Sequence, residues 1–350
     1  VYGFIRFPEA ELIQVIDHPW FQRLRNIKQM GLAHLVYPGA VHTRLAHSLG
    51  ACHLMGKALD ELKAKGVTTN KDEYIAARLA ALLHDIGHGP FSHSLEHTLV
   101  NVPHETLSRL IMTRLDKEFG GLLQKAIQIF DHSYPQKYLH QLVSSQMDVD
   151  RMDYLNRDSF YTGVSEGVIG YDRILQMLTV RDNELMVEEK GVYSVEKFII
   201  ARRLMYWQVY LHKTVLGSEM LLINILRRAK ELAMSGKELF ATPALKYFLY
   251  RELTEDDFRN DPVHLEKYCE LDDSDVMSSI KVWQTNEDKV LSKLCKMLIL
   301  RKLYKVLLSS QSLASILEEK RDIARSKLGL DDNELGYFVF TGEASNSTYN

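Results

Sequence analysis

Apolar residues recur with the period of an α-helix along most of the chain. The clearest run lies within residues 44–65, where the apolar positions are Leu45, Leu49, Cys52, Met55, Leu59 and Leu62. Spacings of three and four residues put these side chains on one face, which predicts a helix. The same period predicts helices at about 12–30, with a break near Pro19, and at 104–118, 121–131, 137–146, 148–160 and 195–233. The sequence therefore predicts a mainly α fold.

Polar residues mark where several helices begin. Asn70 and Glu73 have the spacing of a capping box, and an almost wholly apolar run, 74–83, follows them. This pattern predicts a buried helix. Thr254 and Thr285, each followed by acidic residues, predict helix starts in the last third of the chain.

Two segments favour strands over helices. Residues 179–195 alternate in polarity around Asp182 and Asn183, which predicts a small β-hairpin or a three-stranded flap. Residues 337–341, Tyr-Phe-Val-Phe-Thr, predict a late strand. We expect two units: residues 1–235, which contain the flap, and a helical C-terminal subdomain at 236–350, which contains the late strand.

Composition excludes several classes of protein. The 350 residues carry a formal charge of −3 and no basic tail, so nucleic acid is not expected as the main partner. Three scattered cysteines indicate a reducing compartment and no disulfide framework. No apolar run reaches the roughly 18 residues of a membrane span, and no signal peptide is visible. We therefore expect a cytoplasmic protein without a membrane partner. Phosphate-loop and serine-elbow motifs are also missing.

The candidate chemistry is concentrated in residues 84–93, which contain three histidines and an aspartate. The helix predicted at 74–83 would carry His84 and Asp85 into the interior, and two glycines and a proline would fold the chain back over them. Imidazole nitrogens and carboxylate oxygens suit Mn, Mg, Fe, Ni or Zn. The alternative is a helix end with hydrogen-bonded core histidines.

A metal needs further ligands, and two other segments offer candidates. His47 lies in residues 42–50 and Asp150 in residues 148–155. In chain order, His47, His84 with Asp85, and Asp150 match the pattern of the HD phosphohydrolase superfamily. The chain closely resembles its deoxynucleoside triphosphate triphosphohydrolase branch, which includes vertebrate members that join a SAM domain to the HD domain. The matching segments are 17–25, 37–40, 44–50, 84–93 and 150–154.

This resemblance runs from residue 1 to about 230 and implies that residues 1–235 form an HD domain. It implies hydrolysis of a dNTP to deoxynucleoside and triphosphate, with a divalent metal held by His47, His84, Asp85 and Asp150. The substrate-binding residues that we expect are Gln29, Arg44, Arg151, Tyr154, Asp158, Arg202 and Tyr210. The catalytic residues that we expect are His88, His93, His104 and Glu96.

Helical spacing supports part of this set. Arg44 lies one turn before His47, where its guanidinium suits a phosphate bound at the metal. Two further sets recur at i, i+4 and i+8: Asp150, Tyr154 and Asp158, and Arg202, Tyr206 and Tyr210. Without the resemblance, a solvated acidic face and aromatic core packing are the alternatives for these two sets. Tyr206 stands where the vertebrate members have a His, and Arg151 stands where they have a Lys.

Asp17, Gln22 and Arg25 stand in the segment that forms a guanine-nucleotide activator site at a subunit junction in the vertebrate members. Asp and Gln side chains can bond the guanine edge, and Arg can stack or pair. The resemblance thus implies a homo-oligomer, dimeric or tetrameric, activated by a guanine nucleotide or a dNTP. By spacing alone, the segment is equally an ordinary helix start with a charged face.

Two other functions stay open at this point. One is another HD-type phosphohydrolase, acting on a nucleoside monophosphate, a cyclic nucleotide or an alarmone. The other is a nucleotide-sensing or nucleic-acid-binding module without catalysis. The complete ligand set favours an enzyme, because an inactive site has no chemical reason to keep all four ligands.

Overall fold

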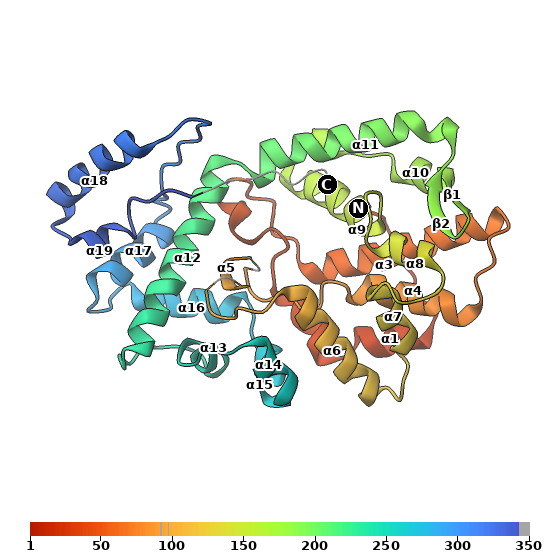
Figure 1. Ribbon diagram of the computed structural model, residues 1–350, viewed down its shortest axis with the longest axis horizontal. Helices are drawn as coiled ribbons and strands as arrows, with labels where there is room; N and C mark the ends of the chain where they lie inside the picture. Colours follow the sequence, from red (N-terminus) through yellow and green to blue (C-terminus); the bar gives the residue numbers. More distant parts are fainter. Residues whose placement is uncertain (92, 97, 343–350) are drawn as a thin grey trace.

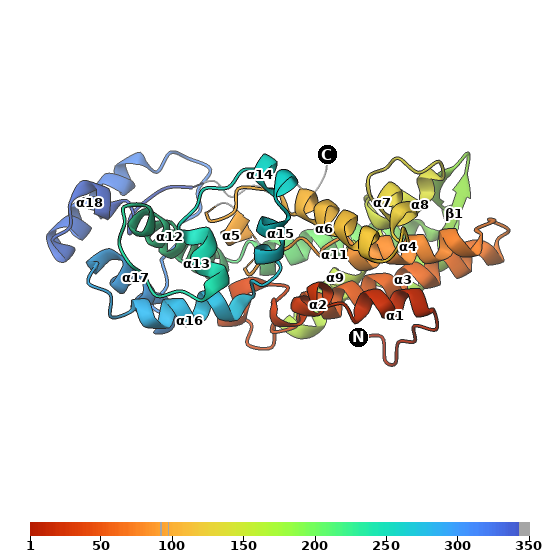
Figure 2. The same ribbon diagram turned by 90° about the horizontal axis from the view of Figure 1, so that it is seen from below.

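The computed structural model describes residues 1–91, 93–96 and 98–342, and it is mainly helical, as predicted. Figures 1 and 2 show a molecule that is longer than it is thick. The helices of its first half are α1 (Ala10–Ile16), α2 (Pro19–Gln22), α3 (Arg44–Ala64), α4 (Lys71–Leu83), α5 (His93–Glu96), α6 (His104–Glu118), α7 (Gln124–Phe130), α8 (Lys137–Val143) and α9 (Val149–Thr162). The break predicted near Pro19 is confirmed, and residues 23–26 and 31–35 form 3₁₀ turns.

Helices α3 and α4 form the centre of this half, and α3 also packs against α9. The capping box predicted for α4 is present: Asn70 Oδ1 accepts from the Glu73 amide, and Glu73 Oε2 accepts from the Asn70 amide, both at 2.9 Å. Every residue of α4 from Ile75 to Leu83 is buried. This part of the helix has no solvent face, so its C-terminal end leads the next residues into the interior.

The predicted flap is a two-stranded antiparallel hairpin, and the third strand considered for it does not form. Strands β1 (Leu178–Arg181) and β2 (Glu184–Val187) pair Leu178 with Val187 and Arg181 with Glu184. The turn residues Asp182 and Asn183 have φ values of 53° and 66°, which the primed hairpin turns require. Gly191 then lies in a 3₁₀ turn.

The single helix predicted at about 195–233 is two helices. Helix α10 (Tyr171–Met177) precedes the hairpin, α11 (Val192–Met205) follows it, and α12 (Lys213–Met234) begins after a π-helical turn at Tyr206–Tyr210. Apolar periodicity continues through a π turn, because the turn only adds one residue to the helix, so the pattern did not reveal the break. Figure 1 shows α12 crossing the molecule between the first half and the C-terminal helices.

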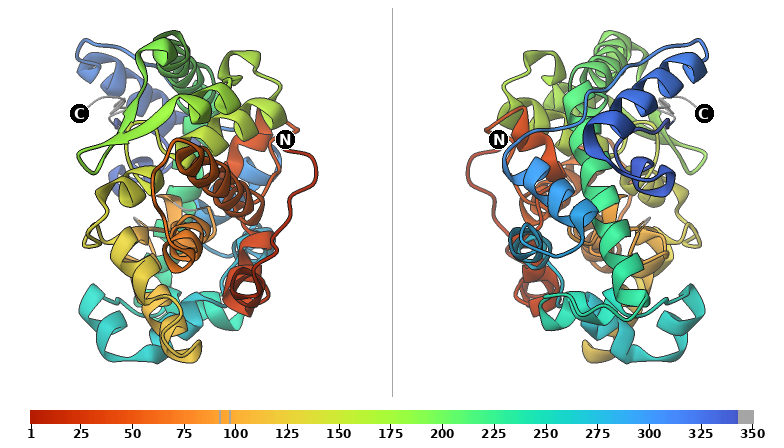
Figure 3. Two further views of the ribbon diagram at one scale, coloured as in Figure 1. Left: turned by 90° about the vertical axis from the view of Figure 1, so that its right-hand side faces the viewer. Right: turned by 90° about the vertical axis from the view of Figure 1, so that its left-hand side faces the viewer.

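The C-terminal helices are α13 (Pro243–Leu249), α14 (Glu255–Asn260), α15 (Pro262–Tyr268), α16 (Asp273–Trp283), α17 (Lys289–Ile299), α18 (Ala314–Leu328) and α19 (Asp332–Leu335). Thr254 caps α14 as predicted, whereas Asp288, and not Thr285, caps α17. Figure 3 shows the two ends of the molecule, with the hairpin and α3 at one end and α18 at the other. No described helix has the length and apolar character that a membrane crossing requires.

The late strand predicted at residues 337–341 is wrong. Residues 337–339 form a turn after α19, in which the amides of Phe338 and Val339 donate to Leu335 O at 2.9 Å. The Tyr337 carbonyl accepts from Asn224 of α12. The segment is therefore held against α12, and it pairs with no strand in the described chain.

Residues from the last third hold the loop at 86–91 that follows α4. Tyr268 donates its hydroxyl to Gly87 O at 2.8 Å, and an Asp273 carboxylate oxygen accepts from the Phe91 amide at 3.3 Å. Arg23 donates to Ile86 O at 2.8 Å and to Leu271 O at 3.3 Å. The boundary proposed at residue 235 stays a prediction. Residues from both of the units that it would separate form hydrogen bonds with this loop.

Replacement of Gly87 by Ala tests how tightly this loop is packed. An added Cβ would lie 2.2 Å from His104 O and 2.3 Å from Ser108 N, both backbone atoms of α6. We expect Gly87→Ala to destabilise the fold by about 1–3 kcal/mol, measured by thermal unfolding. Gly170→Ala is the matched control, because nothing lies within 4 Å of its added Cβ. Equal melting temperatures for the two variants would contradict this packing.

Candidate active site

Three of the four predicted metal ligands meet in one compact group. His47 Nε2 lies 3.3 Å from His84 Nε2 and 3.1 Å from Asp150 Oδ1, and His84 Nε2 lies 3.4 Å from the same carboxylate oxygen. His47 comes from α3, His84 from the end of α4 and Asp150 from the first turn of α9. The packing of these helices therefore brings the donor atoms together.

Hydrogen bonds behind the group fix the orientation of both imidazoles. His84 Nδ1 lies 2.8 Å from Ala81 O, a group that only accepts, so Nδ1 carries the proton and Nε2 presents its lone pair. His47 Nδ1 lies 2.7 Å from Asp153 Oδ2, which assigns the same tautomer when Asp153 is ionised. An outer carboxylate or carbonyl of this kind is typical of metal-bound histidines.

Asp153 is itself positioned by two neighbours. Arg157, one turn later on α9, donates two hydrogen bonds of 2.9 Å to its two carboxylate oxygens. Gly50 of α3 leaves the necessary space, because a Cβ there would lie 1.9 Å from Asp153 Oδ1. We did not predict a role for Asp153. Its position one turn after Asp150 is the signal that would have found it.

Asp85, the fourth predicted ligand, adjoins the group. Its Oδ1 lies 3.4 Å from His84 Nε2, and its Oδ2 lies 3.7 Å from His47 Nε2 and 2.7 Å from Arg44 Nη1. One carboxylate therefore connects the metal group with the arginine that we expect to bind phosphate.

The charges of the group favour a cation. Burial alone would lower the pKa of His47, but hydrogen bonds to Asp150 and Asp153 outweigh it and raise that pKa to about 10. Burial likewise opposes the charged form of His84, yet Asp85 and Asp150 raise its pKa to about 9. Carboxylates that raise the pKa values of two imidazoles this strongly would also stabilise a divalent ion in place of the protons. Two imidazole nitrogens and carboxylate oxygens fit such an ion without selecting one metal.

A cavity of about 500 Å³ opens beside this group. Asp85 and Asp150 line it, together with seven of the eleven predicted substrate-binding and catalytic residues: Gln29, Arg44, His88, His104, Tyr154, Asp158 and Tyr210. The other two predicted arginines do not line it. Arg151 pairs with Asp148, and Arg202 donates to Gln146 Oε1 at 3.0 Å, so their roles stay predictions.

Two of the predicted catalytic histidines stack on each other. The rings of His88 and His104 lie 3.8 Å apart at an angle of 18°, and His88 Nε2 lies 3.4 Å from Asp85 Oδ1. Burial and the nearby Arg44 charge hold the pKa of His88 well below its usual range. Glu96 Oε2 lies 3.2 Å from His104 Nδ1, which places this carboxylate behind the imidazole as expected. His93 begins α5, but its side chain lies outside the described part of the structure.

Another part of the cavity lining is aromatic. The Tyr210 hydroxyl donates to Asp158 Oδ2 at 2.7 Å, and the rings of Tyr154 and Tyr210 lie 6.2 Å apart in a T-shaped arrangement. His42 holds the other oxygen of Asp158 through Nε2, also at 2.7 Å. We had assigned no role to His42. The π turn brings both Tyr206 and Tyr210 into the cavity lining.

The residues predicted for an activator site lie together near α2, and none of them lines the cavity. Gln22 donates to Ile16 O at 2.8 Å, and Arg25 Nη2 donates to Gln22 Oε1 at 2.9 Å. Asp17, at the end of α1, and Arg25 are exposed. This arrangement leaves the activator role a prediction.

The comparisons with known proteins agree with this geometry. The HD domain family matches residues 44–158, which contain the four predicted metal ligands, and the HD associated region matches residues 169–248. A solved phosphohydrolase from Bacteroides thetaiotaomicron is 51% identical over 96% of this chain and 84% of its own, with a TM-score of 0.94. The chain belongs to the HD-domain phosphohydrolase family.

Relatives of this HD-domain chain differ in how much is established about them. YwfO of Bacillus subtilis, an uncharacterized protein, is 36% identical over 87% of this chain and 70% of its own length. A "deoxynucleoside triphosphate triphosphohydrolase SAMHD1 homolog" of Dictyostelium discoideum is 28% identical over 68% of this chain. The chain spans 50% of that triphosphohydrolase. Membership of the HD-domain family supports a metal-binding hydrolase and leaves the substrate open.

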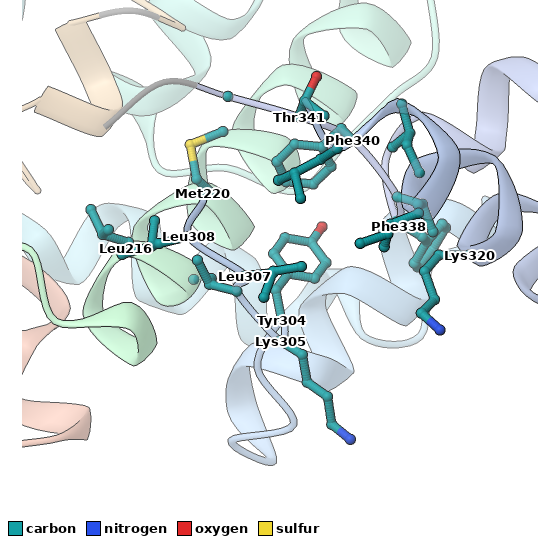
Figure 4. Close-up of a pocket in the computed structure, with 17 residues that line it drawn as sticks. Leu216, Met220, Tyr304, Lys305, Leu307, Leu308, Lys320, Phe338, Phe340 and Thr341 are labelled. Carbon is teal, nitrogen blue, oxygen red and sulfur yellow. The ribbon is translucent and has the colours of Figure 1, made fainter. Parts of the chain in front are cut away.

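A second cavity, of about 410 Å³, also borders α12, and Leu216 lines both cavities (Figure 4). Its lining is mostly apolar and includes Leu216 and Met220 of α12, Leu307, and Phe338 near the end of the described chain. Neither a histidine nor a carboxylate belongs to that lining, so the chemistry of the HD domain belongs to the first cavity.

The metal group predicts the effect of removing Asp150. Because its Oδ1 faces both Nε2 atoms, Asp150→Ala should cost more than the roughly 10–100-fold in metal affinity that outer residues typically contribute. We expect a folded protein with almost no bound metal by elemental analysis and almost no turnover. The exposed Asp172, replaced by Ala, is the control. Near-native metal content in Asp150→Ala would overturn the ligand assignment.

Proposed function

We propose that this protein hydrolyses dNTPs to deoxynucleosides and inorganic triphosphate, using a divalent metal. The observation that carries the proposal is the joint lining of one cavity: Asp85 and Asp150 of the metal group, the cation Arg44, and the tyrosines Tyr154 and Tyr210. A nucleoside triphosphate fits this lining. Its triphosphate is an anion that suits the metal and Arg44, and its sugar and base suit the tyrosines. The similarity to the Dictyostelium triphosphohydrolase favours the same substrate class.

Each group in the cavity has a role in this reaction. His47, His84, Asp85 and Asp150 would hold the metal, which when bound polarises a phosphoryl oxygen and lowers the pKa of water. Arg44 is buried, its Nη1 donates to Asp85 Oδ2 at 2.7 Å, and it lines the cavity beside the metal group, where a guanidinium suits the triphosphate oxygens. Such fixed donors stabilise the charge that grows on phosphate as the bond breaks.

The bond that breaks joins the α-phosphorus to the 5′ oxygen. Water adds its oxygen to phosphorus, and the 5′ oxygen leaves with the pair of bonding electrons and takes up a proton. We propose that His88 and His104 transfer these protons as general acid and base, and that Glu96 orients His104. Tyr210, whose hydroxyl is hydrogen-bonded to Asp158, would pack its ring against the apolar side of the deoxyribose.

The identity of the phosphate product tests this proposal. The protein is incubated separately with each dNTP and with a nucleoside monophosphate, a cyclic nucleotide and an alarmone, in the presence of Mn²⁺ or Mg²⁺. We expect inorganic triphosphate and a deoxynucleoside from dNTPs only. Release of monophosphate or pyrophosphate would contradict the proposal and favour another HD-type activity.

Replacement of Arg44 separates substrate binding from metal binding. Arg44→Ala should keep the metal but lower kcat/KM. The activation free energy obtained from kcat/KM should rise by roughly 2–4 kcal/mol, because the change removes a charge-assisted contact to phosphate. Arg109→Ala, a change at an exposed arginine, should have no effect. Metal loss in Arg44→Ala would instead give Arg44 a structural role through its bond to Asp85.

The proposed activator site at Asp17, Gln22 and Arg25 would bind a guanine nucleotide or a dNTP and favour a dimer or tetramer. An activator that bridges subunits must stabilise the assembled state, so binding and assembly are linked. We expect one dNTP to accelerate hydrolysis of another, and Arg25→Ala to abolish that effect at unchanged basal activity. Mixed-substrate kinetics with light scattering measure both. Pure competition in every mixture would refute the activator site.

A further inference from the structure

Glu219 of α12 lies in the lining of the active-site cavity, and the reaction described above does not use it. It follows Val215 by four residues and Leu216 by three, and all three line the cavity from one helix face. Glu219 is only partly exposed, and it forms no hydrogen bond or ion pair with the residues that the structure describes. Burial raises the pKa of its carboxyl to about 7.

A partly buried carboxyl without a partner costs folding free energy, so its position on a ligand cavity points to recognition. The surrounding lining contributed by α12, by Leu211 just before it and by residues 30–33 includes the apolar side chains of Met30, Ala33, Leu211, Val215 and Leu216. Such side chains suit the faces of a planar ring. A solvated carboxylate is the alternative.

Neither the triphosphate nor the sugar of a dNTP suits Glu219. An anionic carboxylate repels phosphate oxygens, which Arg44 and the metal group attract. The sugar is assigned to Tyr154 and to Tyr210 with its partner Asp158. The base is the part that still needs a polar partner, and its edge carries N–H donors for a carboxylate.

The four bases differ in how they match a carboxylate. Guanine presents N1–H and N2–H side by side, and these give two parallel bonds to the two carboxylate oxygens. Adenine and cytosine place one N–H beside a ring-nitrogen lone pair, which repels the second oxygen. Thymine places its single N–H between two carbonyl oxygens, which repel both.

We propose that Glu219 is a specificity-determining residue that binds the N1–H and N2–H edge of guanine, so that dGTP is the preferred substrate. This inference rests on the proposed dNTP hydrolysis and deepens it.

A competition experiment tests the proposal. Equimolar dGTP, dATP, dCTP and dTTP are supplied together at about pH 8.5, above the raised pKa of Glu219, so that the carboxyl is ionised. Wild-type protein should prefer dGTP by about tenfold or more. The side chain in Glu219→Gln has one donor group and one acceptor at the same place. This variant should therefore lose the preference for dGTP, and its relative rates on dATP and dCTP should rise. Glu196→Gln, a change at an exposed glutamate of α11, should keep the wild-type order.

Binding of each dNTP to the metal-free protein, measured by calorimetry in a chelator, gives a second readout without turnover. The affinities should follow the same order and lose it in Glu219→Gln. Equal preferences in wild-type protein, or an unchanged order in Glu219→Gln, would overturn the role of Glu219. Absence of triphosphate from every dNTP would contradict the proposed function, and the binding order alone would then decide on Glu219.

Discussion

The site depends on two imidazoles that must present their Nε2 atoms to the same point. Ala81 O and Asp153 achieve this by engaging Nδ1 of His84 and His47, and Arg157 holds Asp153 in turn. These partners lie on α4 and α9, so the orientation of both imidazoles depends on how the helices pack. This dependence accounts for the burial of α4 from Ile75 to Leu83 and for the glycine at position 50, where α3 approaches Asp153.

The last third of the chain contributes to the same site. Tyr268 and Asp273 hold the loop at 86–91 from one side, and α12 supplies part of the cavity wall from another. The loop carries His88, so two residues outside the cavity lining help determine where a proposed catalytic group lies. The loop that carries His88 and the wall of the cavity therefore both depend on contacts across the two predicted units.

Local signals allowed part of this to be predicted from sequence. The extent of α3 and α4, the hairpin turn at Asp182 and Asn183, and the grouping of His47, His84 and Asp150 followed from periodicity, capping residues and the family resemblance. The contacts of Tyr268 and Asp273, and the position of Glu219 in the cavity lining, could not be predicted in this way, because each depends on how distant segments pack and lies in no recognisable motif. The strand expected at 337–341 failed for the same reason, since residues that favour strands form one only where a neighbouring strand is available.

The central claim is that water attacks the α-phosphorus of a dNTP. Hydrolysis in H₂¹⁸O, followed by mass spectrometry of both products, tests it most directly. The account predicts one ¹⁸O atom in the inorganic triphosphate and none in the deoxynucleoside. Label in the 5′-hydroxyl of the deoxynucleoside, or in a released monophosphate, would contradict it.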